Sequence, residues 1–366
     1  MNKRQLKNAE WSILICAIIL TIIGLIALYS ATLASDLQAF KKQITWLIVS
    51  IPILLMMMFV DYKLIVRISL PLYIITILLL IVVLFTSAIN GARSWFSIGP
   101  ASIQPAEFGK IAVLLFLASM IDRINQGRQK AINKPLKLIS VIGICLVPVI
   151  LIAIQPDYGT AISYIIALLF MLYVAGINKK YIIVSLLLVI VMLPILYFFV
   201  LPAHAKARID VYLNPNIDPR GAGYNIIQSK LAIGAGGLLG LGWLQGTQTH
   251  LGFLYPKSTD FIFSVIGEEM GFVVAALIVI LYVVMITKAI QVAKTAKDDL
   301  GSYIAMGIVR NFTISRCRKY RNDNRITTNN RYPITIYKLW GKCINYKYNL
   351  HRIIIKYQYE KTKINV

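Results

Sequence analysis

Long apolar runs separated by short polar segments dominate the first 309 residues. A helix of about 20 apolar residues, rising roughly 1.5 Å per residue, crosses the hydrocarbon layer of a bilayer. The pattern predicts eight such helices, which begin near Trp11, Ile44, Ile68, Phe108, Ile139, Thr160, Tyr181 and Phe272. A ninth run begins at Gly301 and ends at Arg310. We therefore expect an all-α, polytopic transmembrane helical bundle of eight or nine spans, forming one membrane domain.

Basic residues in the short loops orient these helices, because Lys and Arg concentrate on the cytoplasmic side of membrane proteins. They precede the first span and follow the second, fourth, sixth and eighth, so they share one side. The other side has Lys41, Lys42, Arg93 and a loop, residues 202–261, that is too long for the rule to apply. We therefore predict a multi-pass protein of the cell membrane with a cytoplasmic N-terminus and an extracytoplasmic long loop.

The composition agrees with this prediction and limits the possible partners. The chain is 58% hydrophobic and 14% charged, whereas soluble proteins have about half and about a quarter, respectively. The net charge of +23 is uneven, because residues 310–366 contain 14 Lys and Arg against 2 Asp and Glu. We therefore expect a membrane protein that binds no nucleic acid. The four cysteines have no metal-binding spacing, so we expect no protein metal motif.

One predicted outward segment joins the third and fourth spans at residues 91–110 and has the sequence GARSWFSIGPASIQPAEFGK. Trp95 is suited to the membrane interface. Glu107 and Lys110 are three residues apart on a helix that begins after a proline. They are either an ion pair that stabilises an interfacial helix or part of a functional site.

Asp157, in the QPDYGTA turn between the fifth and sixth spans, also has two interpretations. It lies next to Gln155 and Thr160, so it can cap the following helix. An ionisable group at the membrane edge can instead face the bundle interior and take part in function.

The long outward loop contains a glycine-rich apolar segment, from Leu231 to Trp243, that is too short to cross the membrane. It predicts interfacial or re-entrant backbone lining a cavity. Asp260 stands where the chain re-enters the membrane, between aromatic residues that would partly desolvate it, as suits a general base. The alternative role of Asp260 is an N-cap of the eighth helix. The carboxylate pair Glu268 and Glu269 lies two turns deeper.

Five motifs, in order, resemble the SEDS family (shape, elongation, division and sporulation), membrane glycosyltransferases that polymerise peptidoglycan. They are GLIALYSAT, GAxxW with QPAEFGK, QPDYGTA, GAGYNIIQSKLAIGAGG and STDFIFSVIGEEMGF, and they cover the chain from about Trp11 to Val309. The first span and the YLNPNIDPRGAGYN stretch resemble the RodA branch, which serves cell elongation, more than the FtsW branch of division.

The resemblance implies a catalytic role for Asp260, the aspartate of the TDFIF motif, and a sensitive position at Trp95. It also implies a substrate-binding set around the outward cavity. That set is Trp95, Arg93, Glu107, Lys110, Asp157 and Gln248. One departure from the family is Lys257, where relatives often have an acidic residue.

The implied substrate is lipid II, a disaccharide pentapeptide on undecaprenyl pyrophosphate, and the implied protein partner is a class B penicillin-binding protein. A sugar hydroxyl would attack an anomeric carbon, with Asp260 as the base and pyrophosphate as the leaving group. Its charge can be stabilised by cationic groups or by a divalent cation as cofactor. The candidate cationic residues are Arg93, Lys110, Lys206 and Arg208.

Residues 310–366 do not follow the pattern of the preceding chain. Asn, Tyr, Lys, Arg and Ile dominate, with a single Gly, where the family continues into two more spans with a PFxSYGG motif. Codons for Asn330 to Leu350 can be chosen so that a frame shifted forward by one nucleotide reads IGIPLPFISYGGSALITNII. We therefore predict a frameshift in the gene, or a sequencing error, near Val309 and an out-of-frame tail. A chain shifted in this way lacks the last two spans, and we expect its activity to be impaired without them. A basic arm that binds anionic lipid is the alternative.

Two other functions are considered beside the lipid II polymerase. A flippase for lipid-linked precursors would need polar groups through the membrane midplane, yet the spans have few charges apart from Glu268 and Glu269. This pattern favours the enzyme. A scaffold for a penicillin-binding protein is compatible with catalysis.

Overall fold

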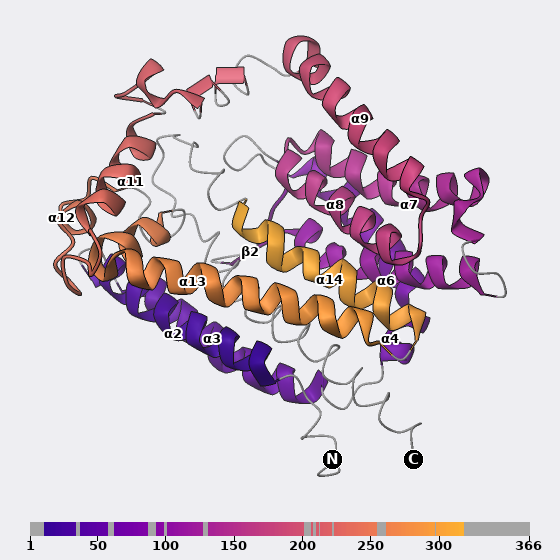
Figure 1. Ribbon diagram of the computed structural model, residues 1–366, viewed down its shortest axis with the longest axis horizontal. Helices are drawn as coiled ribbons and strands as arrows, with labels where there is room; N and C mark the ends of the chain where they lie inside the picture. Colours follow the sequence, from indigo (N-terminus) through magenta and orange to yellow (C-terminus); the bar gives the residue numbers. More distant parts are fainter. Residues whose placement is uncertain are drawn as a thin grey trace.

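The computed structural model is almost entirely helical, and its long helices pack side by side (Figure 1). It describes residues 11–33, 37–57, 62–86, 93–98, 101–126, 131–200, 206–207, 210–211, 213–221, 223–254, 261–296 and 298–317. The long helices are α2 (Trp11–Leu33), α3 (Gln38–Met57), α5 (Ser69–Val82), α6 (Pro105–Asn125), α7 (Pro135–Ile154), α8 (Tyr158–Val174), α9 (Lys179–Ile195), α13 (Ile262–Lys294) and α14 (Asp299–Cys317).

Short elements connect these helices. A two-stranded antiparallel hairpin of β1 (Phe96–Ile98) and β2 (Ala101–Ile103) precedes α6. The remaining elements are α4 (Tyr62–Arg67), α11 (Tyr224–Ala235), α12 (Thr247–His250), the 3₁₀ turns Val83–Phe85, Ala131–Asn133 and Pro215–Ile217, and the π-helical turn Leu196–Val200.

The predicted all-α transmembrane class is confirmed. Helices α2, α7 and α13 are each long and apolar enough to cross a membrane, and shorter apolar helices occupy Ser69–Phe85, Tyr158–Val174 and Asp299–Val309. Each of the eight predicted spans coincides with a long helix, and the ninth apolar run forms α14. In hydrocarbon every backbone polar group needs an internal partner, which is why apolar runs of this length fold as helices.

The predicted start of the eighth span, near Phe272, coincides with the start of the long half of α13, which follows a break at Gly271. A shorter helical half precedes the break and was not predicted. Helix α13 begins at Ile262, and Gly271 is its one non-helical residue. The two glutamates at 268 and 269 lower the local hydropathy, which hides the first part of the helix from an apolar-run criterion. Their carboxylates are buried and bonded to neighbouring elements, so the helix continues through them.

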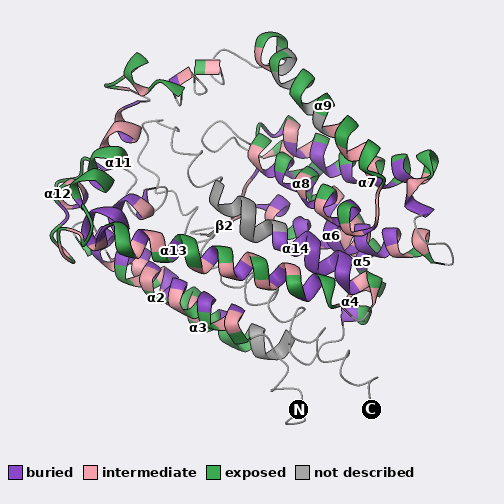
Figure 2. Cartoon of the chain, in the orientation of Figure 1, coloured by how far each residue is buried: buried purple, intermediate pink, exposed green. Residues whose placement is uncertain are grey.

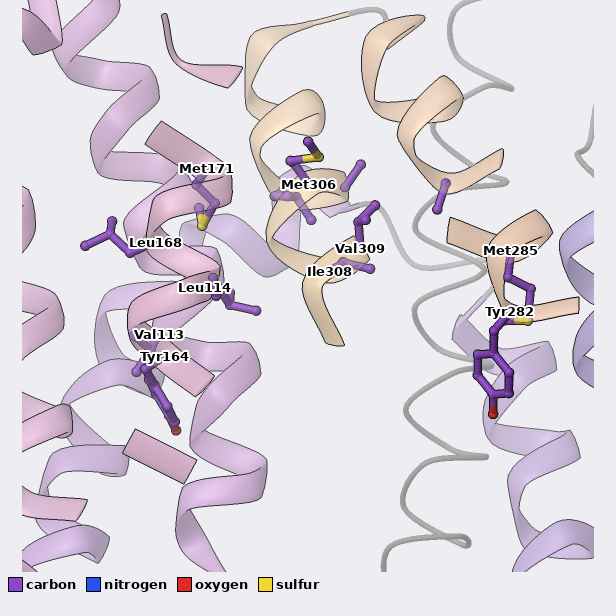
Figure 3. Packing of buried hydrophobic residues seen from close by; sticks show 14 of the residues in the cluster. Val113, Leu114, Tyr164, Leu168, Met171, Tyr282, Met285, Met306, Ile308 and Val309 are labelled. Atoms are coloured by element: carbon purple, nitrogen blue, oxygen red, sulfur yellow. The ribbon is translucent and has the colours of Figure 1, made fainter. Parts of the chain in front are cut away.

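The bundle interior is centred on α14, which packs against α6, α8 and α13 (Figure 3). Residues 301–309 of α14 are all buried. Gly307 allows the closest approach, because a Cβ there would lie 3.0 Å from Met171 Sδ and 3.2 Å from a methyl carbon of Leu114. The ninth apolar run is therefore part of the core.

Helix α2 packs against α13, and several of its buried side chains are small. Gly24, Ala27 and Ala31 are buried, and small residues let two membrane helices approach closely. The outer helices carry many exposed apolar side chains, and Figure 2 shows exposed residues along α9 and α13. This distribution is the one expected where lipid is the solvent.

A proline in α7 creates a second link between helices. Pro148 has no N–H, so the carbonyl of Ile144, four residues earlier, loses its helical partner. The hydroxyl of Tyr73 on α5 donates to that carbonyl at 2.9 Å. The two helices are therefore joined where the intrahelical ladder is interrupted.

Candidate functional site

Helix α13 is broken at Gly271, whose backbone has φ 74° and ψ −175°. A positive φ of this kind is accessible to glycine and costly for other residues. The break separates a short half, residues 262–270, from a long half, residues 272–294. The regular helical hydrogen bonds cannot form across it, so backbone groups on both sides need other partners.

A glycine-rich turn, residues 236–242, bonds the carbonyl groups on one side of the break. The N–H of Leu241 donates to the carbonyl of Glu268 at 2.9 Å, and the N–H of Gly242 donates to the carbonyl of Glu269 at 3.1 Å. This turn follows α11 and belongs to the apolar segment that the sequence predicts to be interfacial or re-entrant.

The same turn bonds the N–H groups on the other side of the break. Phe272 donates to the carbonyl of Gly237 at 3.0 Å, and Val273 donates to the carbonyl of Leu238 at 3.2 Å. The turn and the broken helix therefore exchange four backbone hydrogen bonds. Such an exchange satisfies irregular backbone buried within a membrane protein.

Glu268 joins the first half of α13 to α12. Its side chain is fully buried. Oε1 accepts from the backbone N–H of Gln248 at 2.6 Å and from the hydroxyl of Thr247 at 3.4 Å. Oε2 accepts from the backbone N–H of Thr249 at 3.1 Å and from its hydroxyl at 2.6 Å. Hydrogen bonds to an ionised carboxylate are stronger than neutral ones, so this group fixes the start of α12.

Glu269 joins α13 to α2 instead, and it is only 2% exposed. Its Oε1 accepts from the hydroxyl of Ser30 at 2.5 Å and lies 3.3 Å from His250 Nε2. Within the described part of the chain, Oε2 has no donor at hydrogen-bond distance.

Gln248 presents a polar atom that the fold does not use. Its backbone N–H is held by Glu268, but its side-chain Oε1 is buried and has no hydrogen-bond partner among the described residues. A buried acceptor of this kind is destabilising unless a donor reaches it. We call Ser30, Gln248, Thr249, His250, Glu268 and Glu269 the α13 cluster.

A second polar cluster begins with the β1–β2 hairpin, in which Phe96 pairs with Ile103. Arg93 is exposed, and Trp95 is partly buried with its carbonyl accepting from the hydroxyl of Thr86 at 3.3 Å. The hairpin leads directly into Gln104 and the first turn of α6.

Asp157 links the starts of α6 and α8. Its carboxylate accepts from the backbone N–H of Thr160 at 3.1 Å, from the hydroxyl of Thr160 at 2.6 Å and from Gln104 Nε2 at 2.6 Å. The capping interpretation is therefore confirmed, and the structure adds a bond between two helices. We call Gln104, Glu107, Lys110, Asp157 and Thr160 the α6–α8 cluster.

Glu107 and Lys110 form the predicted ion pair, with 3.0 Å between Lys110 Nζ and Glu107 Oε1. The lysine is 6% exposed although it is charged. Such a group is retained in a membrane protein when it is paired and faces the interior. The pair therefore stabilises the first turn of α6 and keeps a buried cation there.

Several predicted residues are not brought together by the described structure. Asp260, Lys257 and Arg208 lie outside the described residues. Lys206 donates to the carbonyl of Phe198 at 2.9 Å. Across the described ranges no three His, Cys, Asp or Glu residues are grouped closely enough to hold a metal ion.

Four polar residues of the two clusters are absent from the sequence prediction: Ser30, Gln104, Thr249 and His250. Ser30 stands in an apolar helix, Thr249 and His250 in the long loop, and Gln104 immediately before a helix-starting proline. A polar residue in an apolar span was an available signal. Its partner was not available, because Ser30 and Glu269 are 239 residues apart.

The sequence matches a family model described as a cell cycle protein and named for FtsW, RodA and SpoVE, over residues 10–317. The peptidoglycan glycosyltransferase MrdB of Escherichia coli (strain K12) is 41% identical over 239 residues, which are 65% of this chain and 63% of MrdB. A probable peptidoglycan glycosyltransferase FtsW of Trichlorobacter lovleyi is 33% identical over 85% of this chain and 84% of its own length. This chain therefore covers less than two thirds of MrdB.

Solved structures share the fold. A chain from a peptidoglycan synthase complex superposes with a TM-score of 0.76 at 24% identity, covering 95% of this chain and 97% of its own. The rod shape determining protein RodA of Thermus thermophilus superposes with a TM-score of 0.64 at 22% identity, covering 95% and 96%, respectively.

Proposed function

Because this chain belongs to the FtsW, RodA and SpoVE family of cell cycle proteins, we propose that it is a peptidoglycan glycosyltransferase that polymerises lipid II during cell elongation. The observation that carries the proposal is the family match over residues 10–317, together with relatives that are named peptidoglycan glycosyltransferases. We propose further that the reaction takes place at the outer face of the cytoplasmic membrane, where the two polar clusters would lie if the N-terminus is cytoplasmic.

In the proposed reaction a hydroxyl of one lipid-linked sugar attacks the anomeric carbon of another. A new glycosidic C–O bond forms, the C–O bond to the undecaprenyl pyrophosphate breaks, and the hydroxyl proton passes to Asp260. A correctly positioned base contributes about 100- to 10,000-fold to such a step. The pyrophosphate leaves with its electron pair and needs a positive charge nearby.

The substrate-binding set proposed for this reaction is Trp95, Arg93, Glu107, Lys110, Asp157 and Gln248. Lys110 is the buried cation in this set, and its pairing with Glu107 would leave it partly neutralised until a phosphate competes for it. Asp157 would act indirectly, because its carboxylate holds the first turns of α6 and α8 together. A divalent cation is a further candidate for the charge on the leaving group.

A class B penicillin-binding protein is the proposed partner. The related fold of a peptidoglycan synthase complex supports this choice, because that assembly combines polymerisation with crosslinking. The partner would act on the glycan strand after polymerisation, so it is an assembly partner rather than a requirement of the glycosyl transfer.

The test is lipid II polymerisation by the purified protein in lipid nanodiscs, with and without its penicillin-binding protein. Asp260→Asn removes the proposed base with little change in shape and should lower the rate by about 100-fold or more. Asp122→Asn is the matched control. Asp122 lies in the last turn of α6, away from the cluster at the start of that helix, so this variant should polymerise normally. Glycan synthesis unaffected by Asp260→Asn would contradict the base and favour the flippase or scaffold function.

We also propose that residues 310–366 are translated out of frame, with the lesion near Val309. The family match ends at residue 317, so residues 318–366 lie outside it. Genomic sequencing across the codon of Val309 tests the proposal, and an intact frame with no shifted extension would refute it. The polymerisation assay therefore includes both the present chain and a frame-restored version, because only the second would contain the family's last two spans.

A further inference from the structure

We propose that Glu268 is a positioning residue that holds the Gln248 side-chain carbonyl toward a hydroxyl or amide N–H of the lipid-linked sugar substrate. The inference rests on the proposed function and assigns a role to a carboxylate that the reaction itself does not use.

The first argument is the geometry around Glu268. Its two oxygens accept hydrogen bonds from the backbone N–H groups of Gln248 and Thr249 and from the hydroxyls of Thr247 and Thr249. No part of this carboxylate is exposed, so it is unsuited to touch a substrate. The group instead determines the position and direction of α12, where Gln248 is located.

The second argument is the unused oxygen of Gln248. Its Oε1 is buried without a partner in the described part of the chain, although amides in such places are almost always bonded. The residue as a whole is only partly buried, unlike Glu268, so rotation of its side-chain amide can bring Oε1 to a ligand. An acceptor oxygen selects a donor, and the sugars of a lipid-linked disaccharide supply hydroxyl and amide N–H donors.

The third argument is the rigidity of the surroundings. A side chain can aim at a ligand only when its own backbone is fixed. Here the preceding turn is bonded to the break in α13, and Glu268 bonds the backbone N–H of Gln248 itself at 2.6 Å. The Glu268 carboxylate thus fixes the backbone of Gln248 relative to α13.

The first test replaces Gln248 with methionine, which has a similar size and no amide. Because Oε1 has no partner, Gln248→Met should keep or raise the thermal unfolding temperature while it raises the KM for lipid II by roughly 10-fold. A residue with a merely structural role would give the opposite result, a lower unfolding temperature with an unchanged KM.

The second test addresses Glu268 through its partner Thr249, which avoids removing a buried charge. Thr249→Val deletes the hydroxyl donor with nearly the same shape, and Thr249→Ser retains it. We expect Thr249→Val to raise the KM several-fold and Thr249→Ser to remain close to the parent. Glu268→Gln should raise the KM on the order of 10-fold, and combining it with Gln248→Met should add little.

The outcomes separate the two proposals. A frame-restored parent that neither binds nor polymerises lipid II overturns the proposed function, and this inference with it. An active parent in which Gln248→Met and Thr249→Val leave the KM unchanged overturns the positioning role alone. If Glu268→Gln does not fold, the two milder variants still decide the question.

Discussion

Replacing Gly240 with alanine should disconnect the glycine-rich turn from the break in α13. Gly240 has a φ of +87°, and a Cβ added there would overlap the carbonyl group of Glu269 and lie 2.7 Å from the backbone nitrogen of Gly271. Both neighbours are backbone atoms, so no side-chain rotation can relieve the overlap. The turn would have to move away from α13.

The expected loss follows from two contributions. A non-glycine residue at a left-handed φ costs about 1–2 kcal/mol. The displacement also breaks the bonds that Leu241 and Gly242 donate to the carbonyls of Glu268 and Glu269, each worth about 0.5–1.5 kcal/mol net. The free energy of unfolding should therefore fall by about 2–5 kcal/mol.

Two neighbouring glycines provide matched controls. Gly237 also has a positive φ, +52°, but a Cβ there meets nothing within 4 Å, so Gly237→Ala should cost only the conformational term of about 1–2 kcal/mol. Gly234 lies within α11 with open space around it. Gly234→Ala should be neutral or stabilising by about 0.5–1 kcal/mol, because alanine favours a helix.

The assay is reversible unfolding in mixed micelles, followed by tryptophan fluorescence, since Trp243 lies in the affected loop. The expected order of stability is Gly234→Ala, then Gly237→Ala, then Gly240→Ala. Equal stabilities of the Gly237 and Gly240 variants would refute the reasoning, because they would show that the turn does not need close contact with the break.

Three further substitutions test single contacts. Ser30→Ala removes the hydroxyl that bonds Glu269 and should lower the free energy of unfolding by about 1.5–3 kcal/mol, measured in the same micelle titration. Tyr73→Phe leaves the carbonyl of Ile144 without its donor and should cost about 1–3 kcal/mol, with protease resistance of α7 as a second readout. Asp157→Ala removes the cap of α8 and its bond to α6, so hydrogen exchange at the start of α8 should accelerate by on the order of 10-fold.

The first two of these substitutions, Ser30→Ala and Tyr73→Phe, each have a matched control. Thr287→Val removes a hydroxyl that is exposed and bonded only within its own helix, so it should change stability by less than about 0.5 kcal/mol. Tyr173→Phe alters an exposed tyrosine in the same way as Tyr73→Phe. A loss in either control equal to that of its paired variant would show that the contact is not the cause.

The helices and the local polar contacts could be predicted from the sequence, because both depend on residues close together in the chain. Hydrocarbon forces an apolar run of sufficient length into a helix, which explains the agreement for α2 and α7. The Glu107–Lys110 pair and the Asp157 cap each span three residues. Helical geometry alone brings such residues together.

The contacts of the α13 cluster could not be predicted in the same way. In the sequence Gly271 looks like an ordinary glycine in an apolar helix. Its role becomes clear only from the structure, where the turn at residues 236–242 bonds the backbone groups on both sides of the break. Glu268 and Thr249 are 19 residues apart and separated by a loop of unknown path. Sequence periodicity contains no information on which distant backbone groups complete such a site.

The adjacent glutamates explain how one position in α13 can organise two neighbours. Consecutive residues on a helix point about 100° apart, so carboxylates at 268 and 269 cannot serve the same partner. Glu268 turns to α12 and Glu269 turns to Ser30 on α2, while their carbonyls bond the glycine-rich turn. Replacing only one of the two glutamates with an apolar residue should therefore release a different neighbouring helix in each case. Glu268→Leu should remove the bonds that hold α12 and mainly raise the KM for lipid II. Glu269→Leu should remove the bond to Ser30 on α2 and mainly lower the free energy of unfolding.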